Sequence, residues 1–160
     1  PYAVTVFIGP CIAKKVEARE HRETIYYVLF FEEIMCMLEG KDIKFAEMSG
    51  DAAYERDASK LGLSFPLTAG VSAAVQDTVA AMGGEVHKAQ YCSGLDKCRD
   101  TVKAAAASKL DCSYIEGMAC SNGCIDGPAA VGDFHITKVA LTKYAAAAPN
   151  KQAAEDKHTK

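Results

Sequence analysis

Short apolar segments alternate along this sequence with segments of helical character. The run AVTVFI at 3–8 is apolar and β-branched without polar alternation, which predicts a strand buried on both faces. YYVLFFEEIMCMLEG at 26–40 predicts a short strand and then a helix that ends at Gly40. SYIEGMA at 113–119 predicts a further strand. Because strands and helices alternate, we expect an α/β fold with a mostly parallel sheet flanked by helices.

The remaining segments continue this alternation. The other expected elements are strands at 43–48 and 85–91 and helices at 71–84, 94–110 and 134–148, with a loop holding one helical turn at 49–70. The faces expected to point inward on the first two helices carry Val71, Val75, Val79 and Met82, and Leu95, Cys98, Val102 and Ala105. Without a repeat or an evident boundary, we expect one domain over 1–148 and a disordered polar tail over 149–160.

The composition narrows the class of protein. The formal net charge is −3 and the basic residues do not gather in one stretch, which argues against nucleic acid as a partner. No apolar run reaches the roughly 18–20 residues of a membrane span, and no secretory leader is evident. We therefore expect a cytoplasmic protein that binds neither nucleic acid nor membrane.

Seven cysteines is a high count for 160 residues, and their irregular spacing is unlike a disulfide framework. A reducing compartment fits better, with some thiols serving as metal ligands and others as small core side chains. Cys36, Cys98 and Cys112 lie on or beside expected helices, and we interpret them as core residues. Cys92 fits neither group clearly.

The other three cysteines lie in two turns rich in Gly and Pro. Cys11 follows the first expected strand, Cys120 follows the strand at 113–119, and Cys124 stands four residues later. Because the carboxyl ends of parallel strands share one sheet edge, we expect these turns to converge there. Backbone N–H groups in such turns can also stabilise the negative charge of sulfur.

Three converging thiols would suit a soft metal. Zinc thiolate sites usually use paired C-x2-4-C arms, whereas here one arm is the single Cys11 and no histidine lies near either turn. An iron–sulfur cluster accepts scattered single ligands more readily. The remaining alternative is that the three cysteines bind no metal.

Two segments, FIGPCIAKKVE at 7–17 and IEGMACSNGCIDGP at 115–128, resemble signature motifs of the iron-only hydrogenases. FIGPCIAKKVE at 7–17 resembles the family's second motif, Pro-Cys-x-x-Lys-x-x-Glu, through Pro10, Cys11, Lys14 and Glu17. IEGMACSNGCIDGP at 115–128 resembles the third, Glu-x-Met-Ala-Cys-x-x-Gly-Cys, through Glu116, Met118, Ala119, Cys120, Gly123 and Cys124. The resemblance extends over nearly the whole chain up to about residue 145.

The resemblance implies a site as well as a fold. Cys11, Cys120 and Cys124 would bind a 4Fe-4S cubane, and Cys124 would also bridge to the di-iron subsite of the H-cluster. Lys14 would donate a hydrogen bond to a cyanide on that subsite, where an ammonium offsets negative charge; its alternative is a solvated lysine at a helix start. Met118 would pack near the subsite or simply in the core. Pro10 would line the cofactor pocket.

The departures from the family pattern are equally informative. The first family motif, Thr-Ser-Cys-Cys-Pro, is absent from these residues. We therefore expect the C-terminal lobe of a two-lobed catalytic domain, with an N-terminal half preceding residue 1 that supplies the fourth cubane cysteine. Gly9 and Ala13 stand where highly active members carry Met and Ser or Thr, and DGPAAVG at 126–132 replaces a glycine triplet. These changes resemble the less-studied, sensory subgroups, for which rapid turnover is not expected.

The resemblance implies reversible reduction of protons to hydrogen, with a ferredoxin-like electron donor. The isolated chain is expected to be inactive and to lack the di-iron subsite. One alternative is a hydrogen or redox sensor that holds the same cluster. Another is an iron–sulfur assembly protein without the subsite, which the presence of Lys14 argues against. A zinc-binding or purely structural domain is the last alternative.

Overall fold

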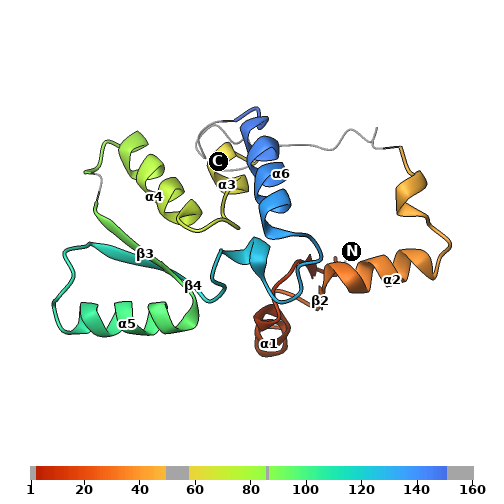
Figure 1. Cartoon of the computed structure of the whole chain (residues 1–160), viewed down its shortest axis with the longest axis horizontal. Coiled ribbons are helices and arrows are strands. Elements are labelled where there is room, and N and C mark those ends of the chain that lie inside the picture. Colours follow the sequence, from red (N-terminus) through yellow and green to blue (C-terminus); the bar gives the residue numbers. More distant parts are fainter. Residues whose placement is uncertain (1–2, 50–57, 86, 151–160) are drawn as a thin grey trace. The chain divides into compact units, whose positions relative to one another are not determined.

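The computed structural model describes residues 3–49, 58–85 and 87–150, drawn in colour in Figure 1. The chain divides into two compact units, and each is described by itself. Unit 1 comprises Pro1–Tyr54 together with Asp126–Gly132, and unit 2 comprises Glu55–Ile125 together with Asp133–Lys160. Unit 1 is therefore built from two stretches that are far apart in the sequence.

Unit 1 is a βαβα arrangement. Strand β1 (Val6–Ile8) is followed by helix α1 (Ala13–Glu20), strand β2 (Tyr27–Leu29), helix α2 (Phe31–Glu39) and the 3-10 turn η1 (Phe45–Glu47). The two strands are parallel, with Phe7 opposite Val28. The N–H of Gly9 donates to the carbonyl of Leu29 at 3.1 Å and extends the pairing toward the following turn.

Unit 2 holds a second parallel pair. Its elements in the described residues are α3 (Lys60–Leu63), α4 (Gly70–Ala81), β3 (Ala89–Ser93), α5 (Leu95–Ala106), β4 (Tyr114–Met118), the start of the 3-10 turn η2 (Cys124–Asp126) and α6 (Phe134–Ala146). Strands β3 and β4 pair in parallel over their full lengths, from Ala89 opposite Tyr114 to Ser93 opposite Met118. Helix α5 connects them and contacts both strands, while α3 contacts α4 and α6.

The predicted class is confirmed, because the chain is α/β with short parallel strand pairs flanked by helices. The strands predicted within 3–8, 26–40, 85–91 and 113–119 occur, as do the helices predicted within 26–40, 71–84, 94–110 and 134–148. In the described residues the strands form two separate pairs, β1 with β2 and β3 with β4. Gly40 ends α2 as predicted, with φ −61° rather than in the left-handed region.

Several local expectations are wrong. Residues 43–48 contain the η1 turn instead of a strand. Strand β1 is not buried on both faces, since Val6 and Ile8 are 42% and 49% exposed. The two apolar faces expected on α4 and α5 are only partly covered, with Val75 of α4 exposed by 40% and Leu95 of α5 by 72%. The apolar periodicity predicted the positions of these helices correctly. Which segments cover the helix faces cannot be predicted from one helix alone, because it depends on other parts of the chain.

Two expectations fall wholly or partly outside the described residues. Positions 50–57 of the loop expected at 49–70 lie outside them, while the one helical turn expected there is present as α3. The polar tail at 151–160 also lies outside them. In the parts of the chain that the structure describes, no helix combines the length and the apolar character that spanning a membrane requires.

Candidate functional site

Cys11 lies in the turn between β1 and α1, in unit 1. It is half-buried and directly precedes Ile12, the N-cap residue of α1. The first turn of this helix has no acidic residue and no side-chain cap. Because the partial positive charge at a helix N-terminus favours anions, this is a suitable place for a thiolate that binds a metal.

Lys14 is in the first turn of α1, and the N–H of Lys14 donates to the carbonyl of Cys11 at 3.3 Å. Its ammonium forms an ion pair with Glu17 at 2.5 Å, one helical turn further on. The two charged residues of the predicted motif are therefore paired with each other. Both side chains remain partly exposed, at 34% and 44%, so Lys14 still has donors to offer a further anion.

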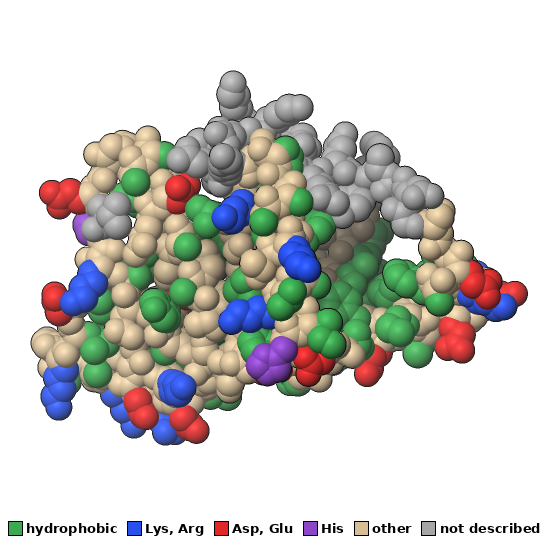
Figure 2. Space-filling view, turned by 45° about the horizontal axis from the view of Figure 1, so that its top comes forward, with side chains coloured by type: hydrophobic (Ala, Val, Ile, Leu, Met, Phe, Trp, Pro, Cys, Tyr) green, Lys and Arg blue, Asp and Glu red, His purple; other side chains and the backbone are tan. Residues whose placement is uncertain are grey.

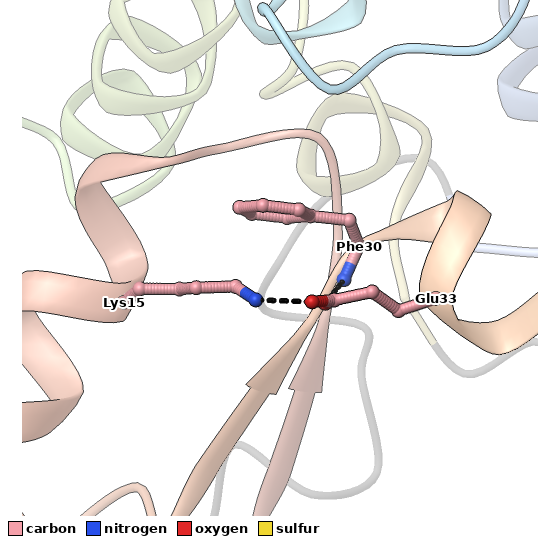
Figure 3. A network of polar contacts seen from close by, with 3 residues as sticks. All are labelled: Lys15, Phe30 and Glu33. Atoms are coloured by element: carbon pink, nitrogen blue, oxygen red, sulfur yellow. Dashed lines mark hydrogen bonds and ion pairs between the residues drawn. The ribbon is translucent and has the colours of Figure 1, made fainter.

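The neighbouring Lys15 is engaged differently (Figure 3). Its ammonium pairs with Glu33 at 2.5 Å and lies 4.1 Å from the centre of the Phe30 ring. The same carboxylate accepts a hydrogen bond from the N–H of Phe30 at 2.7 Å, which caps the start of α2. This network connects α1 to α2 through Lys15. Lys14, the lysine closer to Cys11 in the sequence, is not part of it.

Cys120 and Cys124 lie in one tight turn that follows β4, in unit 2. The turn is closed by a hydrogen bond from the N–H of Gly123 to the carbonyl of Cys120 at 3.2 Å. Gly123 has φ +88°, and a Cβ there would lie 2.5 Å from the carbonyl oxygen of Pro66. Only glycine fits this backbone without strain, and the close approach to Pro66 fixes the turn between the two thiols.

Glu116 anchors the strand that leads into this turn. Its carboxylate accepts a hydrogen bond from the N–H of Ser72 at 2.6 Å, in the first turn of α4. The side chain is buried, and its second oxygen Oε1 has no partner in the described structure. Tyr114 adds a hydrogen bond to the carbonyl of Ser72 at 3.2 Å. Strand β4 and α4 are therefore joined just before Met118 and Cys120.

The structure places each predicted thiol past the carboxyl end of a parallel strand, as expected. Cys11 follows β1, which ends at Ile8, and Cys120 follows β4, which ends at Met118. Unit 1 contains Cys11, whereas unit 2 contains Cys120 and Cys124. Across the described ranges, no three His, Cys, Asp or Glu side chains are grouped so that they could hold a metal ion. The meeting of the three thiols at one site therefore stays a prediction.

The cysteines themselves have the chemistry that an iron–sulfur group requires. None of the seven is in a disulfide. Cys11 and Cys120 are half-buried and Cys124 is exposed, so each sulfur can be reached by a ligand. Soft thiolates on short Gly- and Pro-containing turns fit iron–sulfur ligation on donor type.

Sequence reasoning gave an incomplete account of the other cysteines. Cys36 was predicted to be a core residue and is exposed on α2, which is a correction. Cys98 and Cys112 are half-buried rather than fully buried, and Cys92 is buried. The contact between Cys92 and Cys98 was missed, although the spacing C-x5-C across a strand, a glycine turn and a helix could have indicated it.

The fold has a counterpart among solved structures. The chain is similar to an FeFe-hydrogenase structure from a study of oxygen inactivation by modification and degradation of the H-cluster 2Fe subcluster. The TM-score is 0.53 at 16% sequence identity, and the match covers 98% of this chain and 54% of that one. The chain thus has the hydrogenase domain fold and spans about half the length of this solved hydrogenase. No curated protein matches the sequence.

A family model that matches most of the sequence shows the family of this chain. The family described as iron only hydrogenase large subunit, C-terminal domain, matches residues 2–128. The chain belongs to this family. This family implies iron–sulfur cofactors, and the donor type of the thiol turns described above is compatible with such a group.

Proposed function

We propose that this chain is the H-cluster-binding C-terminal half of an iron-only hydrogenase domain. In the complete protein, the bound cluster would supply the reversible reduction of protons to hydrogen. Cys11, Cys120 and Cys124 would hold the cubane together with a cysteine from the N-terminal half, and Cys124 would also bridge to the di-iron subsite. Electrons would come from a ferredoxin-like donor. The seven cysteines, none in a disulfide, fit a reducing cytoplasm.

One hydrogen bond supports this proposal most directly. The N–H of Ala129 donates to the carbonyl of Pro10 at 3.3 Å, and both residues belong to unit 1. Pro10 immediately precedes Cys11, and Ala129 follows Cys124 by only five residues. Ala129 is buried, so this contact is part of the small core of unit 1. The chain that leaves the third motif therefore returns to the second.

Lys14 would provide a positive donor next to the cluster. Its pairing with Glu17 keeps the ammonium on the first turns of α1, close in sequence to Cys11. An ammonium offers three N–H donors, so an ion pair to one carboxylate leaves donors for a cyanide. Met118 and Pro10 would contribute apolar walls. These side chains would orient the bound group and limit access of water.

The partner is the N-terminal half of the same domain. Apolar side chains are open at the surface of the described residues, as the green atoms of Figure 2 show. In unit 1 the large exposed ones are Val4, Val6, Ile8, Ile12, Val16, Tyr26, Tyr27, Phe31, Met35, Met37, Ile43, Phe45, Met48 and Val131. Exposed apolar surface of this extent is typical of a protein that is described without its partner. The chain spans about half the length of a solved hydrogenase, which supports the other half of such a domain as the partner.

A hydrogen or redox sensor with the same cluster is the second candidate. Gly9 is buried between β1 and Cys11, and a Cβ there would lie 2.8 Å from the ring of Phe7. The methionine of highly active members could not be added at this position unless the ring moved. The part of the proposed cofactor pocket beside Cys11 therefore differs from that of the highly active members. This difference favours low turnover.

The ligand assignment is tested by iron content. The chain and its N-terminal half are produced together with hydrogenase maturation machinery, and iron and the electron paramagnetic resonance signal of the cubane are measured. We expect C11S, C120S and C124S each to lose most of the cubane signal. C36S is the matched control, because it removes an exposed thiol on α2, and should keep the signal. Full iron retention in any of the three variants would contradict the ligand set.

A further inference from the structure

Two thiols outside the proposed ligand set lie in contact in unit 2. The sulfur of Cys92, near the end of β3, is 3.5 Å from the sulfur of Cys98 in the first turns of α5. Cys92 is buried and Cys98 is half-buried. Between them, Gly94 has φ +95°, a conformation that lets the chain turn directly from the strand into the helix. The short distance between the two sulfurs therefore follows from the backbone path at the junction of β3 and α5.

The pair rests on the backbone of β4. Cys92 Sγ donates to the carbonyl of Glu116 at 3.6 Å, and Cys98 Sγ donates to the carbonyl of Met118 at 3.4 Å. A Cβ on Gly117 would lie 3.5 Å from the sulfur of Cys98 and 3.8 Å from that of Cys92. The two sulfurs thus lie over Gly117, the one glycine of β4. Gly117 comes shortly before the turn that carries Cys120.

We propose that Cys92 and Cys98 form a redox-active dithiol that hydrogen peroxide converts into an intramolecular disulfide. The sulfurs need to approach from 3.5 Å to a bond length of about 2.05 Å, a change within reach of side-chain rotation. This site requires no metal and is independent of the proposed function.

The chemistry balances with peroxide as the oxidant. The sulfur of Cys98, the more accessible of the two, attacks one peroxide oxygen. The S–O bond forms, the O–O bond breaks, and the departing hydroxide takes the thiol proton and leaves as water. The sulfur of Cys92 then attacks the sulfenic sulfur, the S–O bond breaks, and the second hydroxide takes the proton of Cys92. Two thiols and one peroxide give one disulfide and two waters.

Contact between the sulfurs, rather than high thiol acidity, drives this reaction. Burial raises the pKa of the Cys98 thiol, and its contact with Cys92 raises it further. The first step is therefore slow relative to an exposed, acidic thiol. Once a sulfenic acid has formed, however, the second sulfur is already adjacent, so disulfide formation precedes further oxidation. The disulfide has no S–H group, so the carbonyls of Glu116 and Met118 each lose a donor.

Peptide mapping tests the proposal on the full chain. Trypsin cuts after Lys88, Lys97 and Arg99, so Cys92 and Cys98 fall on the separate peptides 89–97 and 98–99 unless a disulfide joins them. The chain is treated with hydrogen peroxide, blocked with N-ethylmaleimide, digested without reductant and analysed by mass spectrometry. We expect the joined peptide pair, which reductant separates. C36S should give the same pair, whereas C92S and C98S should lose it.

A second measurement uses phenylarsine oxide, which loses its oxygen as water when two adjacent thiols bind its arsenic. Phenylarsine oxide bound across peptides 89–97 and 98–99, and protection of both thiols from peroxide, would support a close pair in solution. Separate blocking of both thiols after peroxide treatment, or their pairing with other cysteines, would overturn the proposal. Loss of the joined pair in C36S would do the same.

Discussion

Gly123 controls the geometry of the turn between Cys120 and Cys124. Its φ of +88° lies in the left-handed region, and an added Cβ would meet the backbone of Pro66 and Thr68 at 2.5 and 2.9 Å. Both obstacles are backbone atoms, which cannot rotate away as a flexible side chain can. The positive φ and the lack of space for a Cβ therefore each favour glycine at position 123.

We expect Gly123→Ala to lower the free energy of unfolding by roughly 2–5 kcal/mol, since left-handed strain and a forced backbone shift add. Gly83→Ala is the matched control, because Gly83 also has positive φ, +75°, but has no atom within 4 Å of an added Cβ. It should cost about 1–2 kcal/mol from strain alone. Urea unfolding of both variants measures the difference, and equal losses would show that the approach to Pro66 does not constrain the turn.

Single residues were predictable to different degrees. The motif spacings placed Cys11, Cys120 and Cys124 directly after strands, because strand and turn are local features of the sequence. The contact of Cys92 with Cys98 and that of Glu116 with Ser72 were not predicted. The second of these joins residues 44 positions apart, and only the packing of α4 against β4 brings them together.

At the level of elements, the start of α2 depends on one carboxylate. Glu33 accepts from the N–H of Phe30 and pairs with Lys15 of α1. Hydrogen bonds from Lys15 and then from Phe30 lower the pKa of Glu33 below its ordinary value of 4.5. Because the folded-state pKa is lowered, the carboxylate stabilises the fold above its unfolded pKa, and this contribution is lost as the pH falls through the folded value.

We expect acidification from about pH 5 downward to destabilise the wild type more steeply than E33Q, which has no charge to lose at this position. E32Q is the control, since it removes a charge from the same helical turn without touching the pair with Lys15. Thermal unfolding midpoints across this pH range measure the effect. If the curves of wild type and E33Q ran parallel, the network of Figure 3 would not contribute to the pH dependence.

Elements with a strong local pattern were predicted well. Helix α5 and strand β4 lie within the ranges predicted for them. Helix α6 begins where the Asp133 carboxylate accepts hydrogen bonds from the N–H groups of His135 and Ile136. The expected strand at 43–48 was wrong, because IKFAEM is too short to distinguish a strand from a turn by periodicity. The faces of α4 and α5 were misjudged for another reason, since their covering depends on other segments.

At the scale of the whole molecule, the described residues bury few apolar side chains. The buried apolar residues of the described structure are mostly small, namely Ala18, Val28, Cys92, Ile125, Ala129 and Ala145. Large side chains such as Phe45 and Ile136, both 72% exposed, remain open. The family could be predicted from two motifs, but the division into two units could not, because no composition change marks it.

We expect the chain alone to show no hydrogen evolution from reduced viologen after maturation, and activity to appear only when the N-terminal half is present. In the proposed site this half would supply three thiolates, whereas the subsite chemistry needs exclusion of water and oxygen, to which the other half would contribute. Weak iron uptake by the isolated chain is compatible with this expectation, since three cysteines can hold a cubane. Hydrogen evolution from the isolated chain would contradict the half-domain proposal.

Unit 1 is completed by a segment made late in synthesis. Its first stretch ends at Tyr54, and the partner of Pro10, Ala129, is more than seventy residues further along. At ribosomal rates the intervening stretch takes roughly 4–16 s to emerge. During that interval β1, α1 and Cys11 have been synthesised without the segment that donates a hydrogen bond to Pro10. A metal group that requires Cys11, Cys120 and Cys124 together can be inserted only after residue 124 has been synthesised, so loading of the proposed site has to follow synthesis of the third motif.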